Sequence, residues 1–127
     1  MNYIINDIAD YLEDEAVGTV GTNIFVGNLP DSPDTAIAVI DTGGTSPSID
    51  IPTKRPTFQV LVRGTTYAAG KNLVDTIRGL LHNQYNVTLV SGGNYFYSIN
   101  LLAEGGHIGQ NDRGLDEFSM NFQAYTR

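Results

Sequence analysis

Among the first fifteen residues, apolar side chains recur at helical spacing with acidic residues between them. The apolar positions recur every three or four residues: Ile4, Ile5, Ile8, Tyr11 and Leu12. Acidic residues occupy most of the positions between them, which is the pattern of an amphipathic helix with one buried and one solvated side. Gly18 and Gly21 are expected to end this helix because glycine disfavours helical continuation.

Two short strands are predicted next. Residues 23–26 form an apolar run that ends before Pro30, since proline lacks the N–H that a strand ladder needs. Residues 36–40 are apolar without interruption, which is typical of a strand buried on both faces.

A half-buried strand and a second amphipathic helix are predicted in the middle of the chain. Phe58, Val60 and Val62 alternate with Gln59, Leu61 and Arg63 as far as Gly64, so the second set is expected on the other side of the strand. Thr65 or Thr66 can cap the following helix. That helix is expected to end near residues 83–86. Its apolar stripe consists of Leu73, Val74, Ile77, Leu80 and Leu81, and its outward residues include Lys71, Asp75 and Arg78.

Three more strands complete the predicted fold. Residues 86–90 and 95–103 flank the turn sequence Ser-Gly-Gly-Asn, and residues 117–124 alternate strictly between apolar and polar side chains. Consecutive strands with two helices and no strand-helix-strand repetition favour an α+β fold. We therefore predict a single domain over residues 1–127, with a mostly antiparallel sheet and both amphipathic helices packed on it.

Residues 41–56 are predicted to form a long loop. The segment contains two glycines and three prolines and has little periodicity. Loops of this length in compact domains are usually functional or mobile. We expect this loop to contact a partner.

Composition excludes several classes of protein. The chain has 127 residues and no cysteine, so disulfides and thiolate metal sites are excluded and a reducing compartment is favoured. No stretch approaches the roughly 20 apolar residues of a membrane span, so neither export nor membrane insertion is expected. Neither histidine, His82 nor His107, has another metal ligand at the usual spacing, and no cofactor or metal site is predicted.

The net charge of −7 is distributed unevenly along the chain. Residues 1–53 contain nine acidic residues and no Lys or Arg, whereas all seven basic residues lie from Lys54 onward. This asymmetry suits head-to-tail self-association, although a solvated acidic surface would give the same pattern. It does not suit a nucleic-acid-binding protein, which needs a concentrated basic surface.

One motif suggests catalysis. Asp41-Thr42-Gly43 follows an apolar run, as the catalytic aspartate does in aspartic proteases, and a chain this short would need a dimer to bring two copies of Asp41 together. His107-Ile108-Gly109 resembles only partly the apolar-apolar-Gly segment found later in retroviral-type proteases. A homodimeric protease using Asp41 is therefore the alternative to a non-enzymatic role; otherwise the triplet is simply the end of a strand.

The order of several motifs resembles the minor capsid or tail terminator proteins of long-tailed bacteriophages. Residues 56–64, followed by Tyr67 and a helix ending Leu80-Leu81-His82, carry the likeness. Other motifs occur along the chain in the same order as in that family's pattern: residues 41–44, the Gly92-Gly93 turn, residues 108–114 and residues 117–122. The likeness extends from the first helix to the last strand, and residues 41–56 resemble the family least.

The resemblance implies a structural virion protein without enzymatic activity. Such a protein would form a ring, typically a hexamer, at the head-proximal end of the tail tube, where it would end tube growth and contact the head-tail connector protein. It would be located in the virion tail, and in the host cytoplasm during assembly. Genomic DNA would pass through the ring without sequence-specific binding, past an acidic wall to which Asp7, Asp10, Asp14, Asp31 and Asp34 could contribute.

Overall fold

The structure, a computed structural model, describes residues 3–45 and 54–126, over which the chain forms two helices and six strands. Residues 1–2, 46–53 and 127 lie outside the described residues. The elements in chain order are α1 (Ile4–Asp14), β1 (Ile24–Val26), β2 (Ala36–Thr45), β3 (Arg55–Gly64), α2 (Tyr67–Leu81), β4 (Gln84–Thr88), β5 (Tyr95–Gln110) and β6 (Asp116–Thr126).

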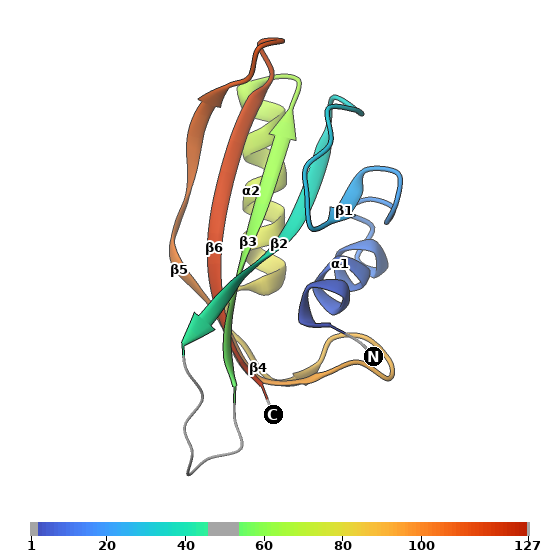
Figure 1. Ribbon diagram of the computed structural model, residues 1–127, viewed down its shortest axis with the longest axis vertical. Coiled ribbons are helices and arrows are strands. Elements are labelled where there is room, and N and C mark those ends of the chain that lie inside the picture. Colours follow the sequence, from blue (N-terminus) through green and yellow to red (C-terminus); the bar gives the residue numbers. More distant parts are fainter. Residues whose placement is uncertain (1–2, 46–53, 127) are drawn as a thin grey trace.

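The strands form one sheet in the order β1-β2-β3-β6-β5-β4. β1 pairs parallel with β2, whereas the other four pairings are antiparallel, so the sheet is mixed. Figure 1 shows a curled sheet with α2 behind its central strands and α1 beside β1 and β2. The prediction of an α+β fold is confirmed.

A single apolar cluster fills the space between the helices and the sheet. α1 contributes Ile8 and Leu12, α2 contributes Ile77 and Leu81, and the central strands contribute most of the aromatic rings. In β6 every second residue from Asp116 to Thr126 is buried, as strand alternation requires. The rings of Phe58 and Phe122, neighbours on β3 and β6, are stacked with their centroids 5.1 Å apart.

The first helix ends earlier than the sequence predicted. α1 stops at Asp14, and Ala16 adopts the left-handed conformation that usually belongs to glycine. The N–H groups of Ala16 and Val17 donate to the carbonyls of Glu13 and Leu12, which satisfies two helix-end acceptors. Gly18 has a different role, because a Cβ there would lie 2.6 Å from the Asn23 Oδ1 that accepts from Thr19 N.

The second helix begins as predicted, and the structure identifies its cap. Thr66 is the N-cap residue, and its Oγ1 accepts from the N–H of Ala69 at 3.1 Å. One turn later, Gly70 lies against β6. A Cβ at Gly70 would lie 2.3 Å from Phe118 Cε1, so glycine is what permits α2 to approach the sheet this closely.

Several other predicted boundaries are wrong. α2 ends at Leu81 instead of near residues 83–86, and Arg55 and Pro56, predicted as loop, begin β3. Asp41 to Thr45, predicted as loop, extend β2 and pair with β3, with a bulge between Asp41 and Gly43. β5 continues to Gln110 instead of ending near residue 103. The prediction missed its outer half because glycines and four register shifts interrupt the alternation of buried and exposed residues. β4 begins at Gln84, before the predicted start at residue 86.

Candidate functional site

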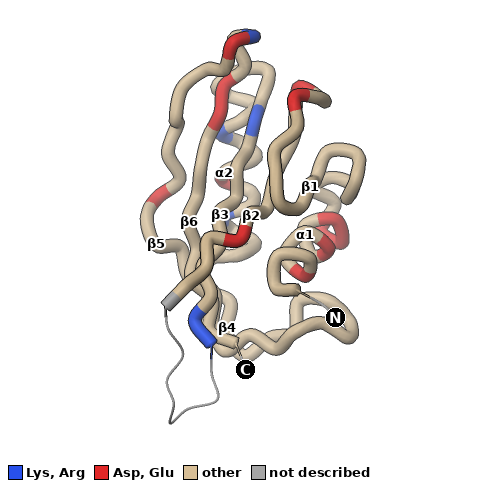
Figure 2. Tube along the Cα trace, in the orientation of Figure 1, with Lys and Arg blue, Asp and Glu red and all other residues tan. Residues whose placement is uncertain are grey.

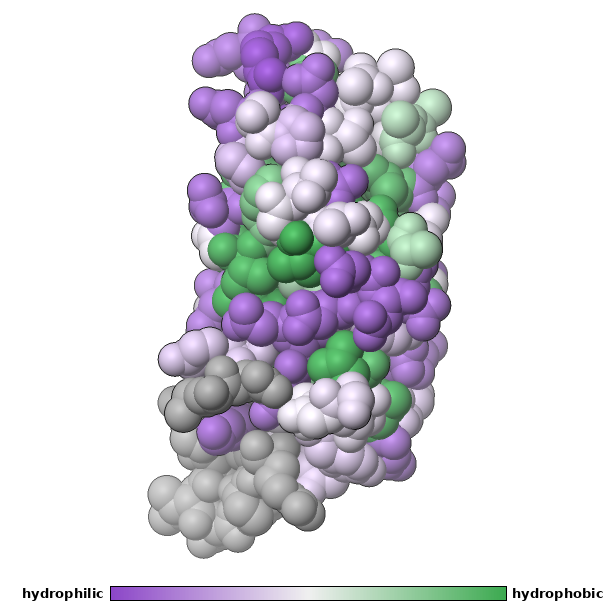
Figure 3. All heavy atoms as spheres, turned by 90° about the vertical axis from the view of Figure 1, so that its right-hand side faces the viewer, coloured by the Kyte–Doolittle hydropathy of each residue, from purple (hydrophilic) through white to green (hydrophobic). Residues whose placement is uncertain are grey.

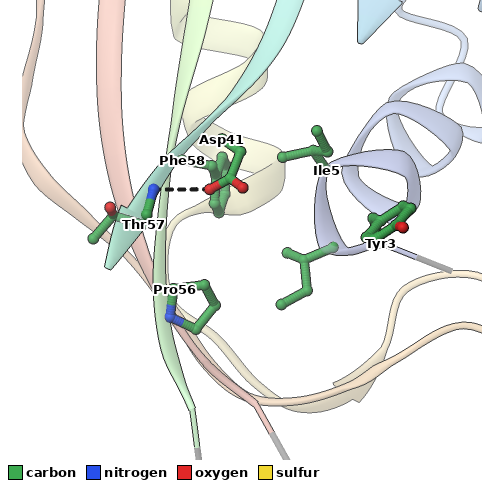
Figure 4. A pocket seen from close by; sticks show the side chains of 8 residues that line it. Tyr3, Ile5, Asp41, Pro56, Thr57 and Phe58 are labelled. Carbon is green, nitrogen blue, oxygen red and sulfur yellow. Dashed lines mark hydrogen bonds between the residues drawn. The ribbon is translucent and has the colours of Figure 1, made fainter. Parts of the chain in front are cut away.

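The outer end of β2 has no strand beside it on the side away from β3. β1 pairs only with Ile37 to Val39, so residues 40–45 have no partner on that side among the described strands. Next to this free end lies a cavity of about 200 Å³ between α1 and the strands. Figure 4 shows side chains of α1 on one side of it and of β2 and β3 on the other. Its lining residues are Tyr3, Ile4, Ile5, Asp41, Gly43, Pro56, Thr57 and Phe58.

Asp41, the candidate catalytic residue, lies at this cavity. Its Oδ1 accepts from the N–H of Gly43 at 2.8 Å, the dashed line in Figure 4, so the carboxylate holds the β2 bulge. Among the described lining residues, Asp41 is the one carboxylate, and most of the others are apolar. The nearby Thr42 and Thr57 hydroxyls bond to each other at 2.7 Å. The arrangement within one chain therefore presents an apolar hollow with a structural carboxylate.

The outer half of β5 is the second free edge. β4 pairs with β5 only as far as Ile99. The His82 ring covers the next part of β5, because its Nδ1 accepts from the backbone N–H of Leu101 at 3.0 Å. Beyond that, residues 102–110 pair with no described strand on the side away from β6. Two aliphatic side chains on this stretch are exposed, Leu102 at 55% and Ile108 at 60%. Sequence reasoning missed this edge.

Two arginines hold the loop between β1 and β2. Arg63, predicted to lie on the polar side of its strand, is 2% exposed. Its Nε donates to the carbonyl of Asp34 at 3.0 Å and its Nη2 to the carbonyl of Pro33. Arg113, on the β5–β6 turn, donates to the Asp34 carboxylate at 2.8 Å and to the carbonyl of Asp31. Two distant segments are thereby joined at one end of the molecule.

The acidic residues of the first fifty positions do not form one surface. Asp7 is buried, and its Oδ2 accepts from both the backbone N–H and the side-chain amide of Asn94 at 2.7 Å. Asp34 is paired with Arg113. The expected contribution of Asp7 to an acidic channel wall is therefore wrong.

Exposed acidic residues are concentrated on the outer side of α1 and at its C-terminal end. Burial and the neighbouring Glu13, Asp7 and Asp14 raise the pKa of Asp10. Figure 2 shows these acidic residues gathered on α1, and Figure 3 shows a hydrophilic band across this side of the molecule, with apolar patches above and below it. The exposed acidic residues of this segment are Asp10, Glu13, Asp14 and Glu15.

The end of the molecule near the N-terminal residue of β3 is basic. Lys54 is exposed, and its backbone N–H and carbonyl both bond to Thr126. The guanidinium of Arg55 lies over the ring of Tyr125, 4.9 Å from the centroid. Figure 2 shows basic colouring at the end of the long axis where β3 begins, whereas acidic and basic residues are mixed at the other end.

The histidines have structural contacts. His107 Nε2 lies 2.9 Å from Asp116 Oδ1, and its ring packs against Tyr67 and Phe118. Strand pairing brings this carboxylate to the histidine, which sequence spacing did not reveal. Over residues 3–45 and 54–126 there is no group of three or more His, Asp or Glu side chains that could hold a metal ion. No helix within these ranges is long and apolar enough to cross a membrane.

A family described as bacteriophage tail terminator protein matches residues 11–126. Because the match covers most of the chain, this protein belongs to the bacteriophage tail terminator family, and it is a structural component of a phage tail.

Solved structures share the fold. One chain of a structure titled as the virion of a native gene transfer agent particle has a TM-score of 0.67 and 13% identity, covering 97% of this chain and 93% of that one. A second solved structure has a TM-score of 0.51 and 14% identity, over 93% of this chain and 87% of that one. A search of curated proteins finds no significant match.

Proposed function

We propose that the protein, acting as one domain, forms a ring at the head-proximal end of the phage tail tube. The ring, a hexamer, ends tube growth by covering the face on which the next tube ring would stack, and it presents its opposite face to the head-tail connector protein. The observation that carries this proposal is the tail terminator match over residues 11–126. The protein assembles in the host cytoplasm and remains in the virion tail.

The mechanism is geometric and needs no catalytic group. A heterologous contact between two different patches closes into a ring when the rotation between subunits closes. The molecule offers such patches, because its two free sheet edges and its two ends differ in charge and shape. The Asp41 carboxylate, engaged with Gly43 N, supports a structural rather than a catalytic role for the Asp-Thr-Gly triplet.

DNA passage adds one electrostatic requirement. We assign the channel wall to the exposed acidic side of α1, which repels phosphates and so disfavours binding. Replacing Asp10, Asp14 and Glu15 together with their amides is expected to slow DNA ejection from purified virions. Replacing Asp75 on α2 serves as the control. Unchanged ejection in the triple variant would remove the channel assignment without affecting the ring.

The experiment that tests the ring is mass measurement of the purified protein, alone and with tail tubes. Native mass spectrometry should give a six-subunit particle, and negative-stain electron microscopy should show rings on one end of each tube. A two-fold particle whose proteolytic activity disappears in Asp41→Asn would establish the protease instead. A protein that forms no ring either alone or on tubes would contradict the proposal.

A further inference from the structure

We propose that the subunits of the ring join edge to edge. The free half of β5 of one copy (residues 102–110) pairs with the free end of β2 of the next copy (residues 40–45). An aliphatic side chain of β5 then enters the cavity beside α1 of that next copy. This inference rests on the proposed ring. It names the two surfaces that form the subunit contact and the second copy of this chain as the occupant of both.

Strand direction supports this pairing. β2, β3, β6 and β5 are successively antiparallel, so β2 and β5 run in opposite directions within one subunit. In a ring whose axis runs roughly along the strands, rotation from one subunit to the next preserves strand direction, so β5 of one subunit meets β2 of the next as an antiparallel pair. Such a pair has the geometry of an ordinary hydrogen-bonded ladder. Because β2 and β5 are different surfaces, the contact is heterologous and can close into a ring.

The two free edges lack the usual protection against pairing. Natural sheets commonly guard edge strands with lysine or proline, and with short strands. Residues 40–45 and 102–110 contain neither lysine nor proline, whereas the strands β1 and β4 that do cover the sheet edges are short. Glycines also keep both edges open to a neighbouring backbone. A Cβ at Gly43 or Gly106 would meet nothing within 4 Å.

Side chains on one edge match a hollow on the other. Leu102 and Ile108 are more than half exposed on β5, although burying either would be favourable. The cavity beside β2 is lined mainly by apolar side chains from Tyr3 to Ile5 and from Pro56 to Phe58. Its volume of about 200 Å³ is below the roughly 300–1,000 Å³ of small-molecule sites. A single aliphatic side chain is the occupant of suitable size and chemistry.

Charge does not oppose the contact. The free end of β2 carries one formal charge, that of Asp41, whose carboxylate is bonded to Gly43 N. The free half of β5 carries Glu104, and both oxygens of that side chain accept from Arg78 of the same subunit at 2.8 Å. Both carboxylates are therefore engaged before the edges meet, and neither needs a partner from the neighbouring copy.

Disulfide trapping tests the pairing directly, because the chain contains no cysteine of its own. Two single-cysteine proteins, Thr42→Cys and Ile108→Cys, are mixed under mild oxidation in the presence of tail tubes. Leu102→Cys is tested in the same way. We expect a cross-linked dimer in at least one mixture and none from any variant alone. Tyr85→Cys on β4, which is as exposed as Ile108 but lies outside residues 102–110, is the matched control and should not cross-link to Thr42→Cys.

A second measurement does not depend on cross-linking geometry. Ile108→Asp and Leu102→Asp are compared with Tyr85→Asp, and circular dichroism checks that each variant folds. Loss of an anchoring contact is expected to weaken ring assembly about tenfold or more in at least one β5 variant and to leave the β4 variant unchanged.

Intact rings in both β5 variants, together with absent cross-links, would overturn the edge pairing while the ring itself stands. Cross-links within the Ile108→Cys protein alone, or to the tube protein, would also overturn it. Absence of rings in the unmodified protein would instead remove the proposed function, and the pairing with it.

Discussion

The centre of the sheet and its outer edges follow different rules. In the centre, β3 and β6 pair without a register shift from Thr57 to Gly64, and buried residues alternate along all of β6 and along β3 from Phe58 to Val62. At the edges, β2 and β5 contain bulges and glycines and extend beyond the strands that cover them. The centre is organised for packing within one subunit, whereas the edges leave backbone groups and apolar side chains exposed, and these are the surfaces that we propose for contact with another subunit.

The largest expected effect comes from breaking the centre. Phe122→Ala removes a fully buried ring that is stacked on Phe58, and it should lower the free energy of unfolding by about 3–5 kcal/mol. Tyr85→Ala, on an exposed position of β4, should change it by no more than about 0.5 kcal/mol. Denaturant unfolding measures both. Equal losses in the two variants would mean that the centre carries no special share of stability.

The bulge at the end of β2 offers a contrast between adjacent glycines. Both Gly43 and Gly44 have positive φ, but a Cβ at Gly44 would also lie 2.4 Å from the carbonyl oxygen of Arg55. Positive φ alone costs alanine about 1–3 kcal/mol, and the backbone clash adds to this. Gly44→Ala should therefore destabilise more than Gly43→Ala in the same unfolding assay. The opposite order would show that β2 does not keep this register.

A buried carboxylate connects α1 to the β4–β5 turn. Asp7→Ala removes the Oδ2 that accepts from the Asn94 N–H and side-chain amide, and the loss of these two bonds should cost about 1–3 kcal/mol of unfolding free energy. Asp14→Ala, exposed on the same helix, is the control and should be nearly neutral. Amide hydrogen exchange should then rise in residues 91–95 for the Asp7 variant only. Unchanged exchange there would argue against the connection.

The smallest effect concerns the ion pair on the β5 edge. Hydrogen bonds from Arg78 lower the pKa of Glu104 below its ordinary value of 4.5. A carboxyl whose pKa is lower in the folded state contributes stability above its unfolded pKa and loses that contribution as pH falls through the folded value. The unmodified protein should therefore lose slightly more stability below about pH 4.5 than Glu104→Gln does, and salt should reduce the difference. Thermal unfolding measured against pH tests this, with Asp75→Asn as the control. Coinciding pH profiles for the unmodified protein and Glu104→Gln would contradict it.

The sequence predicted the centre well because periodicity records packing within one chain. The alternation of Phe118, Met120 and Phe122 identified β6, and Thr66 was among the two expected caps of α2. Continuous burial was expected over residues 36–40, and the structure confirms it for Ala36 to Val39, whereas Ile40 is half-buried.

The candidate surfaces were predicted less well because their signals depend on tertiary contacts. Gly105, Gly106 and Gly109 break the alternation of β5, so its outer half had no strand signature. Arg63 was expected on the polar side of β3, but the carbonyls of Pro33 and Asp34 bury it. Asp7 was counted as a surface charge because nothing in the sequence indicates that Asn94 lies beside it. Of the predicted partner-binding loop, residues 46–53 lie outside the described residues.

The central claim is that this member of the tail terminator family closes a tube, and the length of tubes assembled in its presence tests that claim most directly. Tube protein is polymerised to intermediate length, this protein is added, and then labelled tube protein follows. We predict that one end of each tube receives a ring and incorporates no label, while uncapped control tubes continue to grow. Label incorporated equally at both ends, with this protein present in excess, would contradict the account.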